Sequence, residues 1–117
     1  MLRKVRLELA RCHDFPEGSR HHGYELTLPL TAAGKLDRAA FDKDRQGTGF
    51  RRFWGDEEDR QGVLVHHRAG WQLSFANGEG ADEVIFRGDQ HRFTIGDYVS
   101  IKEFDGETRT FRVAAVS

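Results

Sequence analysis

Apolar and polar residues alternate along much of this chain, and glycine interrupts the alternation at short intervals. From Tyr24 to Leu30 every second residue is apolar, whereas Glu25 and Thr27 between them are polar. In a strand this pattern places one face in a core and the other in water. Short segments of this kind between turns predict β-strands. We expect strands at 2–10, 23–30, 49–54, 62–67, 71–76, 84–87, 91–95, 97–103 and 108–116.

One segment, 37–45, has the pattern of a short helix. Asp37 can cap the first turn, and two alanines followed by Phe41 supply helix formers and an apolar anchor. Many short antiparallel strands with one helix predict a mainly β fold, either a small antiparallel β-barrel or a strongly curved sheet of about 7–9 strands. Gly96-Asp97 before an alternating stretch is typical of strand entry in small barrels. We expect residues 1–117 to form a single domain.

The register of the last hairpin can be predicted from its turn. A three-residue loop, Phe104–Gly106, pairs Val99 with Phe111 and keeps the apolar side chains on one face. Glycine suits the third loop position because that position is left-handed in a hairpin with a type I turn and a bulge.

The same reasoning applied to residues 63–76 predicts another three-residue loop, 68–70. That register pairs Val65 with Leu73, and it places Val63 and Val65 on the apolar face. His67 then lies opposite Trp71, on the core side.

Composition narrows the classes of partner. Eighteen basic residues face 19 acidic ones, so the formal charge of -1 gives no overall attraction to nucleic acid or to a membrane surface. No apolar run has the length of a membrane-spanning helix, so no membrane partner is expected. The lone Cys12 cannot form an internal disulfide, which suits a cytoplasmic location, and we expect it to be buried at the end of the first strand.

Candidate reactive groups are scattered along the sequence. His66 and His67 are adjacent in a strand and therefore point to opposite faces, and no histidine pair has the spacing of a zinc site. The four acids at 56–59 lack the pattern of a calcium loop and are expected to form a solvated loop between strands. We therefore expect no catalytic residue, no metal and no cofactor.

A non-catalytic binding or interaction module is the favoured function, with a protein or a small molecule as partner. Aromatic and arginine side chains are the usual anchors of binding surfaces. The expected surface combines Arg52, Trp54 and His66 with His91 at the end of the barrel.

Two alternatives belong to other classes. Residues 50–54 interleave arginines with aromatic rings, a pattern typical of single-stranded nucleic-acid binding. A small enzyme would use His67 or His91 as a general base beside a carboxylate such as Asp89 or Asp97.

Overall fold

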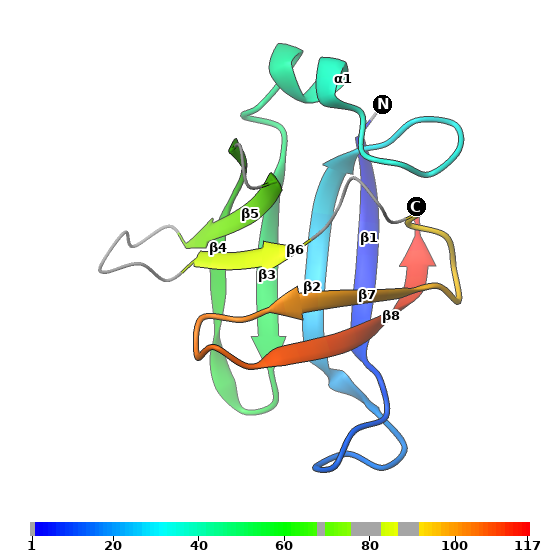
Figure 1. The fold of residues 1–117 in the computed structure, drawn as a ribbon, viewed down its shortest axis with the longest axis vertical. Helices are drawn as coiled ribbons and strands as arrows, with labels where there is room; N and C mark the ends of the chain where they lie inside the picture. The colour runs from blue at the N-terminus through cyan, green and yellow to red at the C-terminus, as the bar shows by residue number, and fades with distance from the viewer. Residues whose placement is uncertain (1, 68–69, 76–82, 87–91) are drawn as a thin grey trace.

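The computed structural model describes residues 2–67, 70–75, 83–86 and 92–117, and these form a small antiparallel barrel. Each strand pairs with the next along the chain, and the last pairs with the first, which closes the ring (Figure 1). The predicted mainly β fold with one short helix is therefore confirmed. The elements are β1 (Leu2–Leu9), β2 (Ser19–Pro29), α1 (Arg38–Lys43), β3 (Gly49–Trp54), β4 (Glu57–His67), β5 (Gly70–Phe75), β6 (Glu83–Phe86), β7 (Tyr98–Lys102) and β8 (Thr108–Val116).

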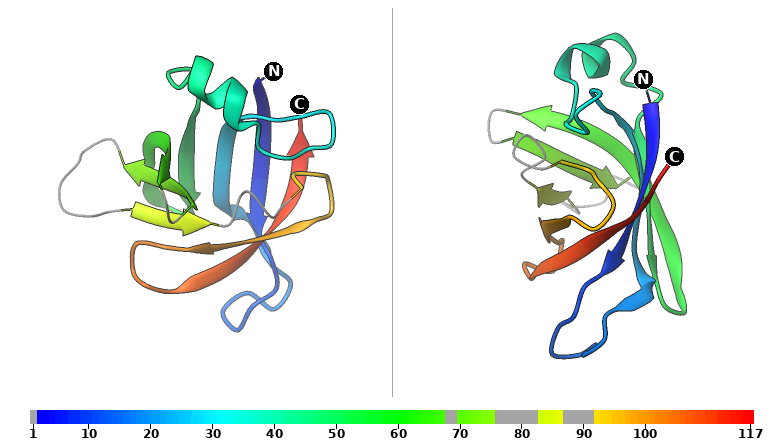
Figure 2. Two further views of the ribbon diagram at one scale, coloured as in Figure 1. Left: turned by 45° about the horizontal axis from the view of Figure 1, so that its top comes forward. Right: turned by 90° about the vertical axis from the view of Figure 1, so that its right-hand side faces the viewer.

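The core lies inside this ring and is built from alternate residues of the strands. In β1, for example, Val5, Leu7 and Leu9 are buried, whereas the residues between them are partly exposed. The extent of strand pairing varies around the ring. The pairing of β1 with β2 runs along the whole of β1, whereas β6 meets β7 at only two register positions. The two views in Figure 2 show how the sheet curls.

Two glycines allow backbones to approach closely where the sheet curves. A Cβ atom at Gly23 would lie 1.9 Å from the carbonyl oxygen of Leu7, and one at Gly62 would lie 2.0 Å from that of Ser74. No side chain fits at such distances, so only glycine permits these strand approaches.

Helix α1 covers one end of the barrel. Asp37 caps it, because the Asp37 carboxylate accepts a hydrogen bond from the Ala40 amide at 3.1 Å, as predicted. Phe41 is 2 % exposed and contacts the Trp71 ring edge-on at 5.1 Å. Nowhere in the described part of the chain is a helix long and apolar enough to cross a membrane.

The predicted register of the β7–β8 hairpin is confirmed. Val99 lies opposite Phe111, and the Glu103 amide donates to the Glu107 carbonyl at 2.9 Å, which leaves a three-residue loop. Gly106 has a φ of 85°, the left-handed conformation that the loop requires.

The predicted register of the β4–β5 hairpin is wrong by one residue. His66 lies opposite Trp71, so Leu64 points into the core at 2 % exposure while Val63 is 51 % exposed. The reason lies on β3, because the Phe50 ring occupies the space above Gly62 and thereby fixes which face of β4 is internal. His66, and not His67, therefore lies beside Trp71.

Three further expectations are wrong. Residues 92–95 form a coil and turn, not a strand, while residue 91 lies outside the described residues. Gly55 and Asp56 suffice for the β3–β4 turn, with a φ of 58° at Gly55, so Glu57–Asp59 belong to β4 and not to a loop. Cys12 is exposed, because the loop after β1 is closed by reciprocal backbone hydrogen bonds between Cys12 and Phe15, and Phe15 packs on the core in its place.

The register of β4 gives a paired prediction. Leu64→Ala removes a buried side chain and should lower the free energy of unfolding by about 2–5 kcal/mol. Val63→Ala, at the neighbouring exposed position, should change it by about 0.5 kcal/mol or less. Urea unfolding of both variants measures the difference, and a larger loss for Val63→Ala would contradict the register.

Candidate functional site

A buried carboxylate lies inside the end of the barrel opposite α1. Glu103 directly follows β7, and its side chain is fully buried. It accepts hydrogen bonds from the Tyr24 hydroxyl, from Arg52 Nε at 2.9 Å and from Arg109 Nη1 at 2.7 Å. Three strands far apart in the sequence are thus joined through one side chain.

The charges of this network stabilise one another. Burial by itself would lower the pKa of Arg52, but the hydrogen bond and negative charge of Glu103 outweigh it and raise that pKa. Hydrogen bonding to Asp105, and then to Glu103, raises the pKa of Arg109. Burial, followed by the Glu103 charge, raises the pKa of the Tyr24 phenol. The network is therefore a neutral tyrosine and two arginines around the Glu103 carboxylate, with Asp105 paired to Arg109 at its edge.

Aromatic rings complete this end of the interior. The Arg52 guanidinium lies 4.1 Å from the centre of the Trp54 ring and 5.2 Å from that of Phe104. Arg60 covers the other side of the cluster, 4.5 Å from Phe104. These cation–π contacts pack Arg52 as part of the core, whereas Arg60 remains exposed.

The structure brings together only part of the predicted binding surface. Arg52 and Trp54 are in contact, but Arg52 is 5 % exposed and ion-paired with Glu103. His66 lies at the α1 end, 2.6 Å from Arg38 Nη1. His66 lies six positions along β4 from Arg60, the partner of Arg52, which is roughly 20 Å along a strand. His91 lies outside the described residues.

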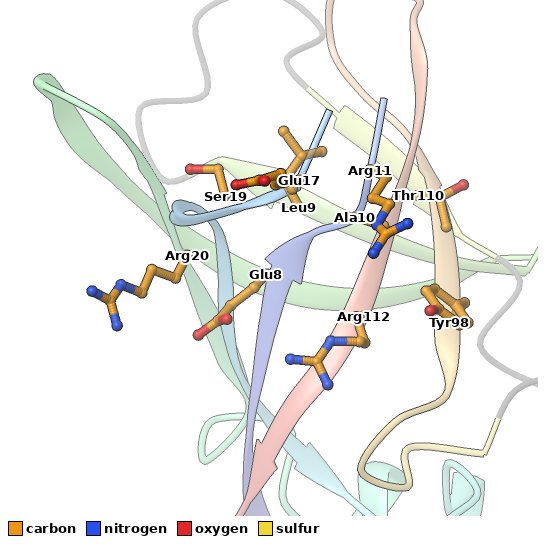
Figure 3. Close-up of a pocket in the computed structure, with 11 residues that line it drawn as sticks. Glu8, Leu9, Ala10, Arg11, Glu17, Ser19, Arg20, Tyr98, Thr110 and Arg112 are labelled. Carbon is orange, nitrogen blue, oxygen red and sulfur yellow. The ribbon is translucent and has the colours of Figure 1, made fainter. Parts of the chain in front are cut away.

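A groove of about 970 Å³ lies on the outside of the barrel, between the loop that joins β1 to β2 and the outer face of β7 and β8. Arg112 on β8 has Glu8 on one neighbouring strand and Tyr98 on the other, and the three form a row across the sheet (Figure 3). The residues that line the groove are Glu8, Leu9, Ala10, Arg11, Glu17, Gly18, Ser19, Arg20, Tyr98, Thr110 and Arg112.

The groove has an excess of uncompensated positive charge. Arg6, outside the groove, pairs with Glu8 at 2.9 Å, so Glu8 already has a cation although Arg112 lies opposite it. Within the described residues, the three exposed arginines of the groove, Arg11, Arg20 and Arg112, form no ion pair. Tyr98, in the same row, is 58 % exposed.

A serine and a histidine meet at the loop-side rim of this groove. Ser19 Oγ lies 2.7 Å from His22 Nδ1 and accepts a hydrogen bond from the His21 amide at 3.2 Å. The pairing of β1 with β2 shifts here, because Glu8 lies opposite Gly23 but Leu9 lies opposite Ser19. This bulge brings together two side chains that a regular strand would point to opposite faces.

The surroundings of His22 restrict the orientation of its ring and favour its neutral form. The ring centre lies 4.6 Å from that of Phe15 and 4.8 Å from that of Trp54, which it meets edge-on. Burial, and then the charges of His21 and Arg52, lower the pKa of His22, while Glu57 opposes them weakly. The imidazole is therefore held neutral near pH 7.

The described residues contain no group of three or more His, Cys, Asp or Glu side chains that could hold a metal ion. Of the residues named for a histidine-based enzyme, the His67 side chain, His91 and Asp89 lie outside the described part of the chain. Asp97 is exposed, and its carbonyl accepts from the Val113 amide at the entry of β7.

The chain thus presents a small closed barrel with a buried ion network and an arginine-lined external groove. Comparisons with protein-family models, with curated proteins and with solved structures found no match.

Sequence reasoning missed Glu103 and the groove for different reasons. The alternation Val99, Ile101, Glu103 would have placed the carboxylate on the core side, so a signal existed. The groove joins a loop to two strands about 100 residues away, and nothing local in the sequence indicates that contact.

The buried network gives a stability prediction. Glu103→Gln keeps the shape but leaves the buried Arg52 without its anion and Arg109 with Asp105 alone, which should lower the free energy of unfolding by about 3–5 kcal/mol. Glu107→Gln, an exposed neighbour, is the matched control and should change it by about 0.5 kcal/mol or less. Equal effects in chemical denaturation would contradict the assigned role.

Tyr24 gives a prediction at alkaline pH. Its pKa is raised above the ordinary value of 10.0, so its stabilisation is complete below pH 10 and is lost as the pH rises further, when the unfolded chain ionises first. The stability advantage of the wild type over Tyr24→Phe should shrink by about 1.4 kcal/mol per pH unit above pH 10. Denaturant titrations from pH 8 to 11 measure it, and a constant difference would contradict the prediction.

Proposed function

We propose that this protein is a binding module that takes an anionic partner in the groove beside the β1–β2 loop. The observation that carries the proposal is the set of three exposed arginines, Arg11, Arg20 and Arg112, without ion pairs in the described residues. Exposed arginines gain most from a carboxylate or phosphate, whose geometry matches the guanidinium fork.

An acidic protein segment is the partner that this groove fits best. Its volume of about 970 Å³ is at the upper end of the range for small-molecule pockets, and it is open along the outer face of β8. Thr110 and Tyr98 add hydroxyl groups to the lining beside the arginines (Figure 3), as is common in polar protein interfaces. The lone Cys12 makes the cytoplasm the compartment that we propose.

Single-stranded nucleic acid is a second candidate for the same groove. Tyr98 is 58 % exposed directly opposite Arg112, and an exposed ring beside a cation can stack on a base while the cation contacts phosphate. Strand β3, the nucleic-acid surface expected from the sequence, favours this function less, because Arg52 is buried and Arg51 is paired with Glu25 and Asp59.

Removal of the groove arginines tests the proposal. The variant with Arg11, Arg20 and Arg112 replaced by alanine should bind a fluorescein-labelled hexaglutamate peptide at least about tenfold more weakly than the wild type in fluorescence anisotropy. A matched control replaces Arg3, Arg38 and Arg45, which are exposed at the α1 end or near it and give the same change in net charge.

The outcomes separate the candidates. An equal loss in both triple variants, or no binding by the wild type at low salt, would overturn the groove as a binding site. Tighter binding of single-stranded oligothymidine than of the peptide, lost in Tyr98→Ala, would replace the acidic protein segment by nucleic acid.

A further inference from the structure

The serine and histidine at the rim of the groove have the geometry of a nucleophile and its base. Ser19 Oγ and His22 Nδ1 are 2.7 Å apart, within the range of a strong hydrogen bond. Because Ser19 Oγ already accepts from the His21 amide, its own proton is free to be donated to Nδ1. Ser19 also belongs to the lining of the groove, so the pair lies beside a place where a molecule can bind.

We propose that Ser19 is an acyl-accepting nucleophile activated by His22, and that the substrates are esters that carry a negative charge. The proposal goes beyond binding and uses the groove of the proposed function only for the charge of the substrate. The base is positioned by contact with two rings, Phe15 and Trp54, which restrict rotation of the imidazole. The neutral state of His22 near pH 7 leaves Nδ1 able to accept a proton.

The reaction balances with water as the only co-reactant. Ser19 Oγ bonds to the ester carbonyl carbon as its proton passes to His22 Nδ1. The bond to the leaving alcohol then breaks, and that alcohol takes the proton from the imidazolium. Water repeats the sequence on the acyl-serine and releases the acid and free Ser19. No oxidation or reduction occurs.

The groove arginines give this site its preference for negatively charged esters. Arg11 and Arg112 line it, and a guanidinium can pair with an anionic group of the ester or with the oxyanion that forms during attack. Glu17, also in the lining, is outnumbered by the arginines. The strand bulge that brings Ser19 to His22 is a feature often found beside active sites.

A fluorophosphonate, which reacts with activated serines, tests the pair without depending on the groove arginines. We expect one adduct per wild-type chain, located at Ser19 by peptide mass spectrometry. Labelling should be absent in Ser19→Ala and about 100-fold slower in His22→Gln. Ser100→Ala is the matched control, because Ser100 is an exposed serine that is hydrogen-bonded to Thr110, and its labelling should equal that of the wild type.

A second measurement, the pH dependence of labelling, uses the wild type alone, so it does not depend on the folding of a variant. The labelling rate of the wild type should rise with pH and reach its plateau before pH 6.5. Burial, and then the charges of His21 and Arg52, lower the pKa of His22 from 6.5 against the opposing charge of Glu57, so the imidazole is already neutral there. Hydrolysis of mono-4-nitrophenyl succinate should then exceed that of 4-nitrophenyl acetate, and Arg112→Ala should reduce this preference.

No labelling of wild-type Ser19, or labelling that is unchanged in a folded His22→Gln, would overturn the proposal and leave Ser19 as a turn-forming hydroxyl. Failure of peptide binding with normal labelling would instead overturn only the binding function. The two proposals therefore fail in distinguishable ways.

Discussion

The end of the barrel opposite α1 depends on the neutralisation of one buried negative charge, the Glu103 carboxylate. Glu103 has no contact with water and is surrounded by Tyr24 of β2, Arg52 of β3 and Arg109 of β8. A buried charge without partners is severely unfavourable, so each of these strands must be in place before the carboxylate is satisfied. The interaction ties strand pairing to side-chain chemistry, because the closed ring is the arrangement that brings its three donors together.

The same network restricts where binding can occur. Arg52, Trp54 and Phe104 fill their end of the interior with a cation between rings, and the exposed Arg60 covers Phe104 from outside. At the other end, Phe41 of α1 packs against Trp71. A partner must therefore meet side chains outside the ring, and in the described part of the chain three arginines without ion pairs gather in the groove beside the β1–β2 loop.

Local signals in the sequence were sufficient for the fold and for one hairpin. Gly106 and the alternation around Val99 determine the β7–β8 register, because one face of that hairpin is clearly apolar. In β4 both faces carry apolar residues, so alternation could not decide between Val63 and Leu64. The deciding contact, Phe50 above Gly62, comes from another strand.

The binding surface was harder to predict than the fold for the same physical reason. An arginine such as Arg52 in a strand is expected to be exposed and to act as a binding anchor. Its burial follows only from the hydrogen bond to Glu103, 51 residues later in the sequence. Ser19 and His22 come together only through a bulge that no glycine or proline marks at its centre. Burial and pairing of charged residues depend on distant partners, whereas turn geometry depends on neighbours.

The pairing of β1 with β8 also sets how the barrel would be presented within a larger assembly. The Lys4 amide donates to the Ser117 carbonyl at 3.0 Å, and the Ser117 amide returns a hydrogen bond to Lys4 at 2.9 Å, so the two ends of the described chain lie side by side. The loop between β1 and β2 lies at the far end of the molecule (Figure 1). A tether attached at either end would therefore leave from the side of α1, and the arginine-lined groove would face away from the point of attachment.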